Sequence, residues 1–148
     1  MARPTLQPVI EKVFHKLGGH QALGADVSSE ADLARIVHRG LRVVVLGHVQ
    51  KAGFSKQEIE RFIIPGRTWR HRKKKKTLSI EQSDRVVRLT RIQALAEDVF
   101  GDVEKANRWL REELGILDGK SPLEVARTDS GARLIEQLLA KLDWGAAA

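Results

Sequence analysis

The sequence predicts an all-α fold in two parts: an N-terminal helical domain with a helix-turn-helix, residues 1–100, and a smaller helical domain, residues 101–148. Three observations support this prediction. Apolar residues recur at helical spacing through most of the chain, and helix start and stop signals separate these runs. No internal repeat or long low-complexity linker interrupts them.

The first helix is predicted from an apolar stripe that ends at two glycines: Leu6, Val9, Ile10, Val13, Phe14 and Leu17. Gly18–Ser29 is predicted to be a loop, and Ser29 followed by Asp32 is an N-cap signal for the next helix. The Val-rich segment Gly40–Gly53 favours a strand by propensity. A helical stripe and a C-cap glycine at its end outweigh this, so we predict a helix that buries Leu41, Val44, Val45, His48 and Val49 on one face.

A capping box, Ser55 with Glu58, begins another helix, and Pro65-Gly66 ends it. A short helix is predicted over Thr68–Lys75, directly after this turn near residues 65–66. Helix, tight turn and helix therefore follow one another, and the second helix is basic throughout.

Start signals also precede the remaining helices. They predict a long helix from Ser79 to Gly101, a helix after Asp102, a loop marked by two glycines, and a helix start at Ser121. The last helix is predicted near Ser130–Leu142, before an alanine tail.

The basic helix is the first candidate for function. Seven of the ten residues in Arg67–Lys76 are Arg or Lys, and a segment of this charge favours a polyanion such as nucleic acid. In the major groove, Arg side chains read guanine edges, whereas Lys, Thr and backbone amides hold phosphates. The candidate DNA-binding residues are Arg67, Thr68, Arg70, Arg72, Lys73, Lys74, Lys75 and Lys76.

Two features of this helix allow other interpretations. Trp69 is expected to face the core and lock the helix onto the preceding one, while contact with a sugar or thymine methyl is the alternative. The four lysines could be a solvated helix end, and they also look like a nuclear-import cluster. Base readout is therefore expected from the arginines rather than from the lysines.

Charge and composition restrict the class of protein. Residues 1–100 hold 19 Lys and Arg against 10 Asp and Glu, a net +9, whereas residues 101–148 hold 7 against 9, a net −2. The absence of cysteine excludes disulfides, zinc–cysteine sites and thiol catalysis. No apolar run approaches membrane-spanning length and no leader is evident, so a cytoplasmic protein without a membrane partner is expected.

Nothing in the sequence indicates an enzyme. The five histidines have no metal-ligand spacing, and the chain has no Gly-rich phosphate loop or Ser-centred elbow. No catalytic residue, metal or cofactor is expected.

From Gly40 onward, an ordered set of short motifs resembles the Xre/MbcA/ParS-type antitoxins of bacterial toxin–antitoxin operons. The motifs are Gly40-Leu41, Gly53-Phe54-Ser55, Pro65–Thr68, Leu78–Arg85, Phe100-Gly101-Asp102, Ala106–Leu110, Gly119–Leu123 and Thr128–Gly131. They cover over two-thirds of the chain. After Leu110 the chain departs from the family pattern with "REELGIL" in place of a Pro-Asn-like step.

The resemblance implies a Cro/Xre-like helix-turn-helix domain followed by a C-terminal toxin-binding domain, in a dimer or larger assembly. The implied partner is a RES-domain toxin, which consumes NAD or uses it for ADP-ribosylation; the antitoxin covers the active site and represses its own operon. The candidate toxin-binding residues are Trp109, Leu134, Leu138, Lys141, Asp143, Trp144, Gly145 and Ala148.

The residues themselves agree with partner docking, because residues 101–148 are too few for a self-sufficient core yet hold two Trp and a leucine-rich last helix. Leu110 is expected in the core and Trp144 at the contact. A stand-alone transcription regulator whose C-terminal half only oligomerises is the alternative. RNA binding is a distant third, because the chain lacks an aromatic stacking platform.

Overall fold

A computed structural model describes residues 8–147, without the side chains of Lys73, Lys74, Lys75, Trp144, Ala146 and Ala147. Over these residues the chain forms helices and turns, with two isolated β-bridges and no extended strand. The predicted all-α fold is confirmed. The chain forms two compact units: an amino-terminal unit up to Thr90 and a carboxy-terminal unit from Arg91. The predicted boundary at residue 100 coincides with the end of a helix, α7 (Ile80–Phe100), which begins in one unit and ends in the other.

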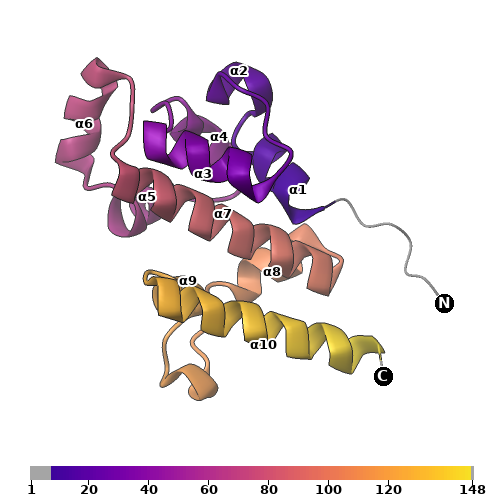
Figure 1. The fold of residues 1–148 in the computed structure, drawn as a ribbon. Coiled ribbons are helices and arrows are strands. Elements are labelled where there is room, and N and C mark those ends of the chain that lie inside the picture. Colours follow the sequence, from indigo (N-terminus) through magenta and orange to yellow (C-terminus); the bar gives the residue numbers. More distant parts are fainter. Residues whose placement is uncertain (1–7, 148) are drawn as a thin grey trace. The chain divides into compact units, whose positions relative to one another are not determined.

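The amino-terminal unit contains six helices and the start of α7 (Figure 1). They are α1 (Val9–Lys16), α2 (Gly19–Leu23), α3 (Glu30–Arg39), α4 (Val45–Lys51), α5 (Lys56–Phe62) and α6 (Gly66–Lys75). Its core consists mainly of aliphatic side chains with almost no exposed surface, among them Leu17, Leu46 and Ile59. Helix α6 lies at the edge of this unit, away from α1 (Figure 1).

The segment Gly18–Ser29 is not only a loop, because α2 lies within it. Glycines with positive φ, Gly18 and Gly24, bracket this helix, which buries Ala22 and Leu23. Five residues are too few to show a helical period in the sequence. The prediction of a loop was therefore wrong here.

The segment Gly40–Gly53 contains the predicted helix, but α4 begins only at Val45. The residues before it pair with the chain that follows α6: the Val43 N–H donates to the Lys76 carbonyl at 2.9 Å, and the Leu78 N–H to the Leu41 carbonyl at 2.7 Å. Because this pairing turns the chain before the helix starts, Val44 is 54% exposed instead of lying on the buried stripe.

The carboxy-terminal unit contains the end of α7, then α8 (Val103–Trp109), a 3-10 turn η1 (Gly115–Leu117), α9 (Pro122–Val125) and α10 (Asp129–Ala147). Helix α10 is the longest element that lies wholly in this unit (Figure 1). It continues past Leu142, where the last helix was expected to end. Alanine is the best helix former, and one glycine in the last turns costs too little to stop the helix.

The helix starts predicted from capping residues are confirmed. Ser29, Ser55, Asp102 and Ser121 each accept a hydrogen bond from a backbone N–H three residues later. Ser55 and Ser121 form complete capping boxes. Among the described helices, none has the length and apolar composition needed to cross a membrane.

Candidate nucleic-acid interface and partner-binding surface

Helices α5 and α6 form the helix-turn-helix that the sequence predicts. Helix α5 ends at Phe62, α6 begins at Gly66, and the three residues between them include Ile63 and Ile64, which are 2% and 0% exposed. The start of α5 is fixed by its capping box: the Ser55 hydroxyl accepts from the Glu58 N–H at 3.1 Å, and the Glu58 carboxylate accepts from the Ser55 N–H at 2.9 Å. The buried turn therefore anchors α6 to the rest of its unit.

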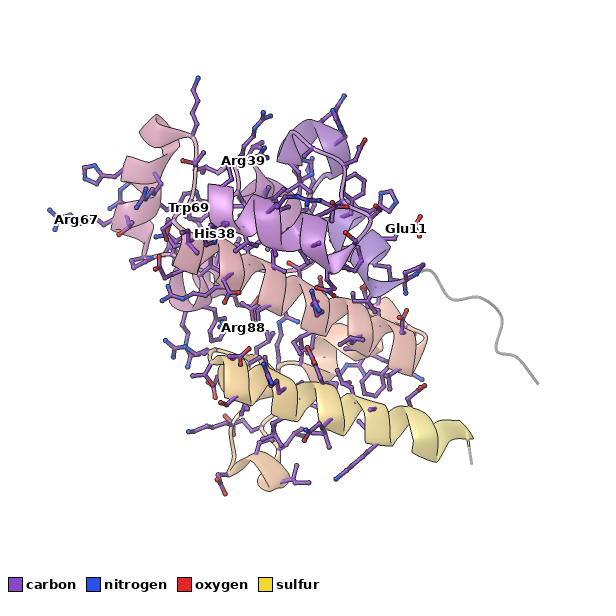
Figure 2. All side chains as sticks on the ribbon, viewed as in Figure 1. Glu11, His38, Arg39, Arg67, Trp69 and Arg88 are labelled. Atoms are coloured by element: carbon purple, nitrogen blue, oxygen red, sulfur yellow. The ribbon has the colours of Figure 1, made fainter. Side chains whose placement is uncertain are left out.

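Helix α6 has one buried face and one solvent face. Trp69 is only 9% exposed and points inward, whereas Arg67 points away from the unit (Figure 2). This confirms the core-facing interpretation of Trp69. Arg70 and His71 are also exposed. At about 100° per residue, they lie on the same side of the helix as Arg67.

The predicted DNA-binding residues do not all share this solvent face. Arg67, Arg70 and Lys76 are exposed, whereas Thr68 and Arg72 are half-buried. The side chains of Lys73, Lys74 and Lys75 lie outside the described part of the chain. His71 was not among the candidates, although it stands four residues after Arg67 and this spacing alone could have indicated it.

The first turn of α6 has no side-chain cap. Its N-cap residue, Pro65, has extended backbone geometry and makes no capping hydrogen bond through its side chain. The first amides of a helix lack partners inside the helix, so they can receive a phosphate. With Arg67 in the same turn, this end of α6 suits the backbone of a duplex.

Side chains in the first turns of α7 bind the backbone of two earlier segments, one of which is the α5–α6 turn. The Arg85 guanidinium donates to the carbonyl of Ile63 in the α5–α6 turn at 3.1 Å. The Ser83 hydroxyl, which is buried, accepts from the Leu41 N–H at 2.9 Å. These two contacts give Ser83 and Arg85, in the Leu78–Arg85 motif, a role in positioning the backbone.

The last helix buries one face and exposes leucines on another. Ile135 and Leu139 are 0% and 2% exposed, whereas Leu134 is 48% and Leu142 is 39% exposed. Leu138 is half-buried between the last two, at four-residue spacing. We call Leu134, Leu138 and Leu142 the leucine stripe.

The other predicted toxin-binding residues are placed as follows. Lys141 and Gly145 are exposed on α10, and Asp143 is half-buried. Trp109 is half-buried at the end of α8, with its ring centroid 5.5 Å from that of Phe100 and the two planes at 48°. The Trp144 side chain and all of Ala148 lie outside the described part of the chain. Leu110 is fully buried, as expected.

The corner before α10 explains another motif. The Thr128 hydroxyl accepts from the Gly131 N–H at 3.0 Å. A Cβ on Gly131 would lie 1.7 Å from the carbonyl oxygen of Val125, at the end of α9. Only glycine allows α9 and α10 to meet this closely.

The described residues show no group of three or more His, Asp or Glu side chains able to hold a metal ion.

Comparison with known proteins assigns a family to each part. Residues 32–91 match the antitoxin Xre-like helix-turn-helix domain, and residues 95–145 match the antitoxin Xre/MbcA/ParS C-terminal toxin-binding domain. The antitoxin Xre of Yersinia enterocolitica is 30% identical over 127 residues, which cover 83% of this chain and 86% of that protein.

The chain belongs to the Xre antitoxin family.

Other Xre antitoxins are similar. That of Photorhabdus laumondii is 29% identical over 129 residues, covering 84% of this chain and 87% of its own length. That of Pseudomonas putida is 36% identical over 84 residues, covering 56% of this chain; the match spans only about half, 53%, of that protein. This Xre-family chain thus carries a helix-turn-helix domain and a toxin-binding domain.

Proposed function

We propose that the chain neutralises a RES-domain toxin with its carboxy-terminal unit and represses its own operon by binding operator DNA through α6. The observation that carries the proposal is the separation of two surfaces: exposed arginines on α6 in one unit and the leucine stripe on α10 in the other. A cationic helix and an exposed apolar stripe suit partners of different chemistry.

In the DNA-binding part of the proposal, the solvent face of α6 enters the major groove. Arg67 and Arg70 read base edges, while Thr68, Arg72 and the lysines up to Lys76 hold phosphates. The positive net charge of residues 1–100 favours approach to any duplex. A homodimer would present two copies of α6 to an operator with two half-sites.

In the toxin-binding part, residues 101–148 act as the toxin-binding domain and α10 covers the cleft in which the toxin holds NAD. The leucine stripe supplies the apolar centre of the contact, and Lys141, Asp143 and Gly145 lie beside it. Trp109, Trp144 and Ala148 complete the proposed surface. The RES class of the toxin rests on the family resemblance, and the antitoxin itself needs no catalytic residue or cofactor.

The experiment is co-expression with the toxin encoded by the adjacent gene. Replacing Leu134 and Leu142 together by Lys should abolish both co-purification and protection of the cells, because two charges would be buried in the contact. Ile116→Lys is the control: Ile116 is 75% exposed in the same unit but lies outside the stripe.

The alternative is a regulator whose leucine stripe only joins two copies of the chain. In that case the parent chain would neither co-purify with the toxin nor protect cells from it, and the double variant would change only the mass of the free chain. Loss of protection with an unchanged mass of the free antitoxin would instead support toxin docking.

A further inference from the structure

An acidic side chain lies against the start of the cationic helix. A Cβ built on Gly66, the first residue of α6, would lie 2.8 Å from Glu60 Oε1 and 2.9 Å from Glu60 Cδ. The Glu60 carboxylate, which is half-buried on α5, therefore packs directly on the backbone at the amino end of α6. A side chain at position 66 would displace it.

The carboxylate shares its surroundings with one cation of the proposed DNA interface, Arg70, and with Lys56. Lys56, Glu60, Gly66, Trp69 and Arg70 line a cavity of about 170 Å³ between α5 and α6. Lys56 and Arg70 are exposed, and Trp69 forms the buried wall. The negative charge of Glu60 thus lies between α5 and α6, near the positive charges of Lys56 and Arg70.

The position of this charge opposes general DNA binding. The amino end of a helix attracts anions through its free amides and its dipole, and α6 has no side-chain cap there. A duplex phosphate is the anion expected at this end of a DNA-binding helix. A carboxylate a few ångströms away repels that phosphate on every sequence alike, whereas hydrogen bonds to base edges form only on the correct sequence.

We propose that Glu60 sets the general DNA affinity of α6: its carboxylate weakens the attraction of α6 for phosphates on every sequence, so that binding is tight only where base contacts add to it. The proposal rests on the proposed function of α6 as the DNA-binding helix. It concerns the absolute affinity for duplex, because a repulsion that is equal on every sequence leaves the ratio of operator to random-DNA affinity unchanged.

The test is Glu60→Gln, which keeps the size of the side chain beside Gly66 and removes its charge. Binding would be measured for the full chain on a duplex from the promoter of its own operon and on a random duplex of equal length, over a series of salt concentrations. At low salt, affinity should rise about three- to tenfold on both duplexes, by the same factor on each. The slope of log K against log salt should steepen by about one on both duplexes.

The matched control is Glu11→Gln, which changes the net charge by the same amount. Glu11 is exposed on α1, at the far end of the amino-terminal unit from Arg67 (Figure 2). If Glu60→Gln behaves like this control, only net charge matters and the proposal fails. If Glu60→Gln weakens binding to both duplexes, Glu60 serves to position α6 and the proposal also fails.

Failure of the underlying DNA assignment is recognised separately. If Arg67→Ala combined with Arg70→Ala leaves promoter binding unchanged, α6 is not the DNA-binding helix. Glu60→Gln therefore tests the role of Glu60 once the double variant has been shown to lose promoter binding.

Discussion

Arg70 carries the sharpest prediction for a single residue, because it is exposed on α6 directly after the buried Trp69. Arg70→Ala should weaken binding to the operator by about 1–3 kcal/mol and relax sequence preference, since an Arg that reads guanine makes two hydrogen bonds to one base. Fluorescence anisotropy on operator and random duplexes measures both effects. Arg133→Ala, in the other unit, is the charge-matched control. Equal losses on the two duplexes would refute the assignment of Arg70 to base readout.

Asp32 makes the stability of the α3 start depend on pH. The Ser28 N–H, which donates to its carboxylate at 3.0 Å, is the main cause that lowers the pKa of Asp32 from 3.8 to about 2; the hydroxyls of Ser29 and Ser28 and the Arg35 guanidinium contribute further. A lowered pKa means that the charged form is stabilised by folding. This stabilisation is complete above the unfolded pKa and is lost as the pH falls through about 2.

Asp32→Asn should therefore melt at a lower temperature than the parent chain near neutral pH, and the difference should shrink as the pH falls from about 4 to about 2. Thermal denaturation followed by circular dichroism at a series of pH values measures it. A difference that stays constant over this range would contradict the role of the charged carboxylate.

Residue roles that depend on local pattern could be predicted from the sequence, whereas roles that depend on distant contacts could not. The buried positions of Trp69 and Leu110 follow from helical spacing. The roles of Ser83 and Arg85 do not, because their backbone partners lie 42 and 22 residues away in the chain. Glu60 was missed for a different reason: its neighbour Gly66 is close in the chain, but their contact depends on how α6 packs against α5 after the turn.

Among the helices, the junction of α9 and α10 is the most sensitive to a small change. Gly131→Ala places a Cβ 1.7 Å from the Val125 carbonyl oxygen, so the two helices must move apart. We expect a loss of about 2–4 kcal/mol in the free energy of unfolding, measured by denaturant titration.

Gly145→Ala in the same helix is the control, since a Cβ there meets no atom within 4 Å. It should be neutral or stabilise the chain by up to about 1 kcal/mol, because alanine is the better helix former. Similar effects of the two substitutions would show that the contact between α9 and α10 is not tight.

Helices with side-chain caps could be predicted because their signals are local. The starts of α3, α5, α8 and α9 are examples. The start of α4 was misplaced because long-range backbone pairing of residues 41–43 with 76–78 competes with the helix. The extension of α10 to Ala147 was missed because Trp144-Gly145 looked like a stop.

For the whole molecule, the sequence established the order of the two functional parts through its charge division and its motifs, and the family matches support that order. The boundary between the two compact units is harder to predict from the sequence, because the units divide near Thr90, within the continuous helix α7. A continuous helix carries no composition change or turn signal at the point where one core ends and another begins. The extent of the toxin-binding surface stays a prediction for another reason. The structure shows which side chains of α10 are exposed, but the sequence does not contain the partner that would cover them.

The most direct test of the central claim compares two variants in two assays. One variant combines Arg67→Ala with Arg70→Ala, and the other lacks residues 143–148; each is assayed for operator binding and for protection of cells from the cognate toxin. We predict that the arginine variant loses operator binding and still protects, while the shortened chain binds operator and no longer protects. A shortened chain that protects cells as well as the parent would contradict toxin neutralisation by the end of α10.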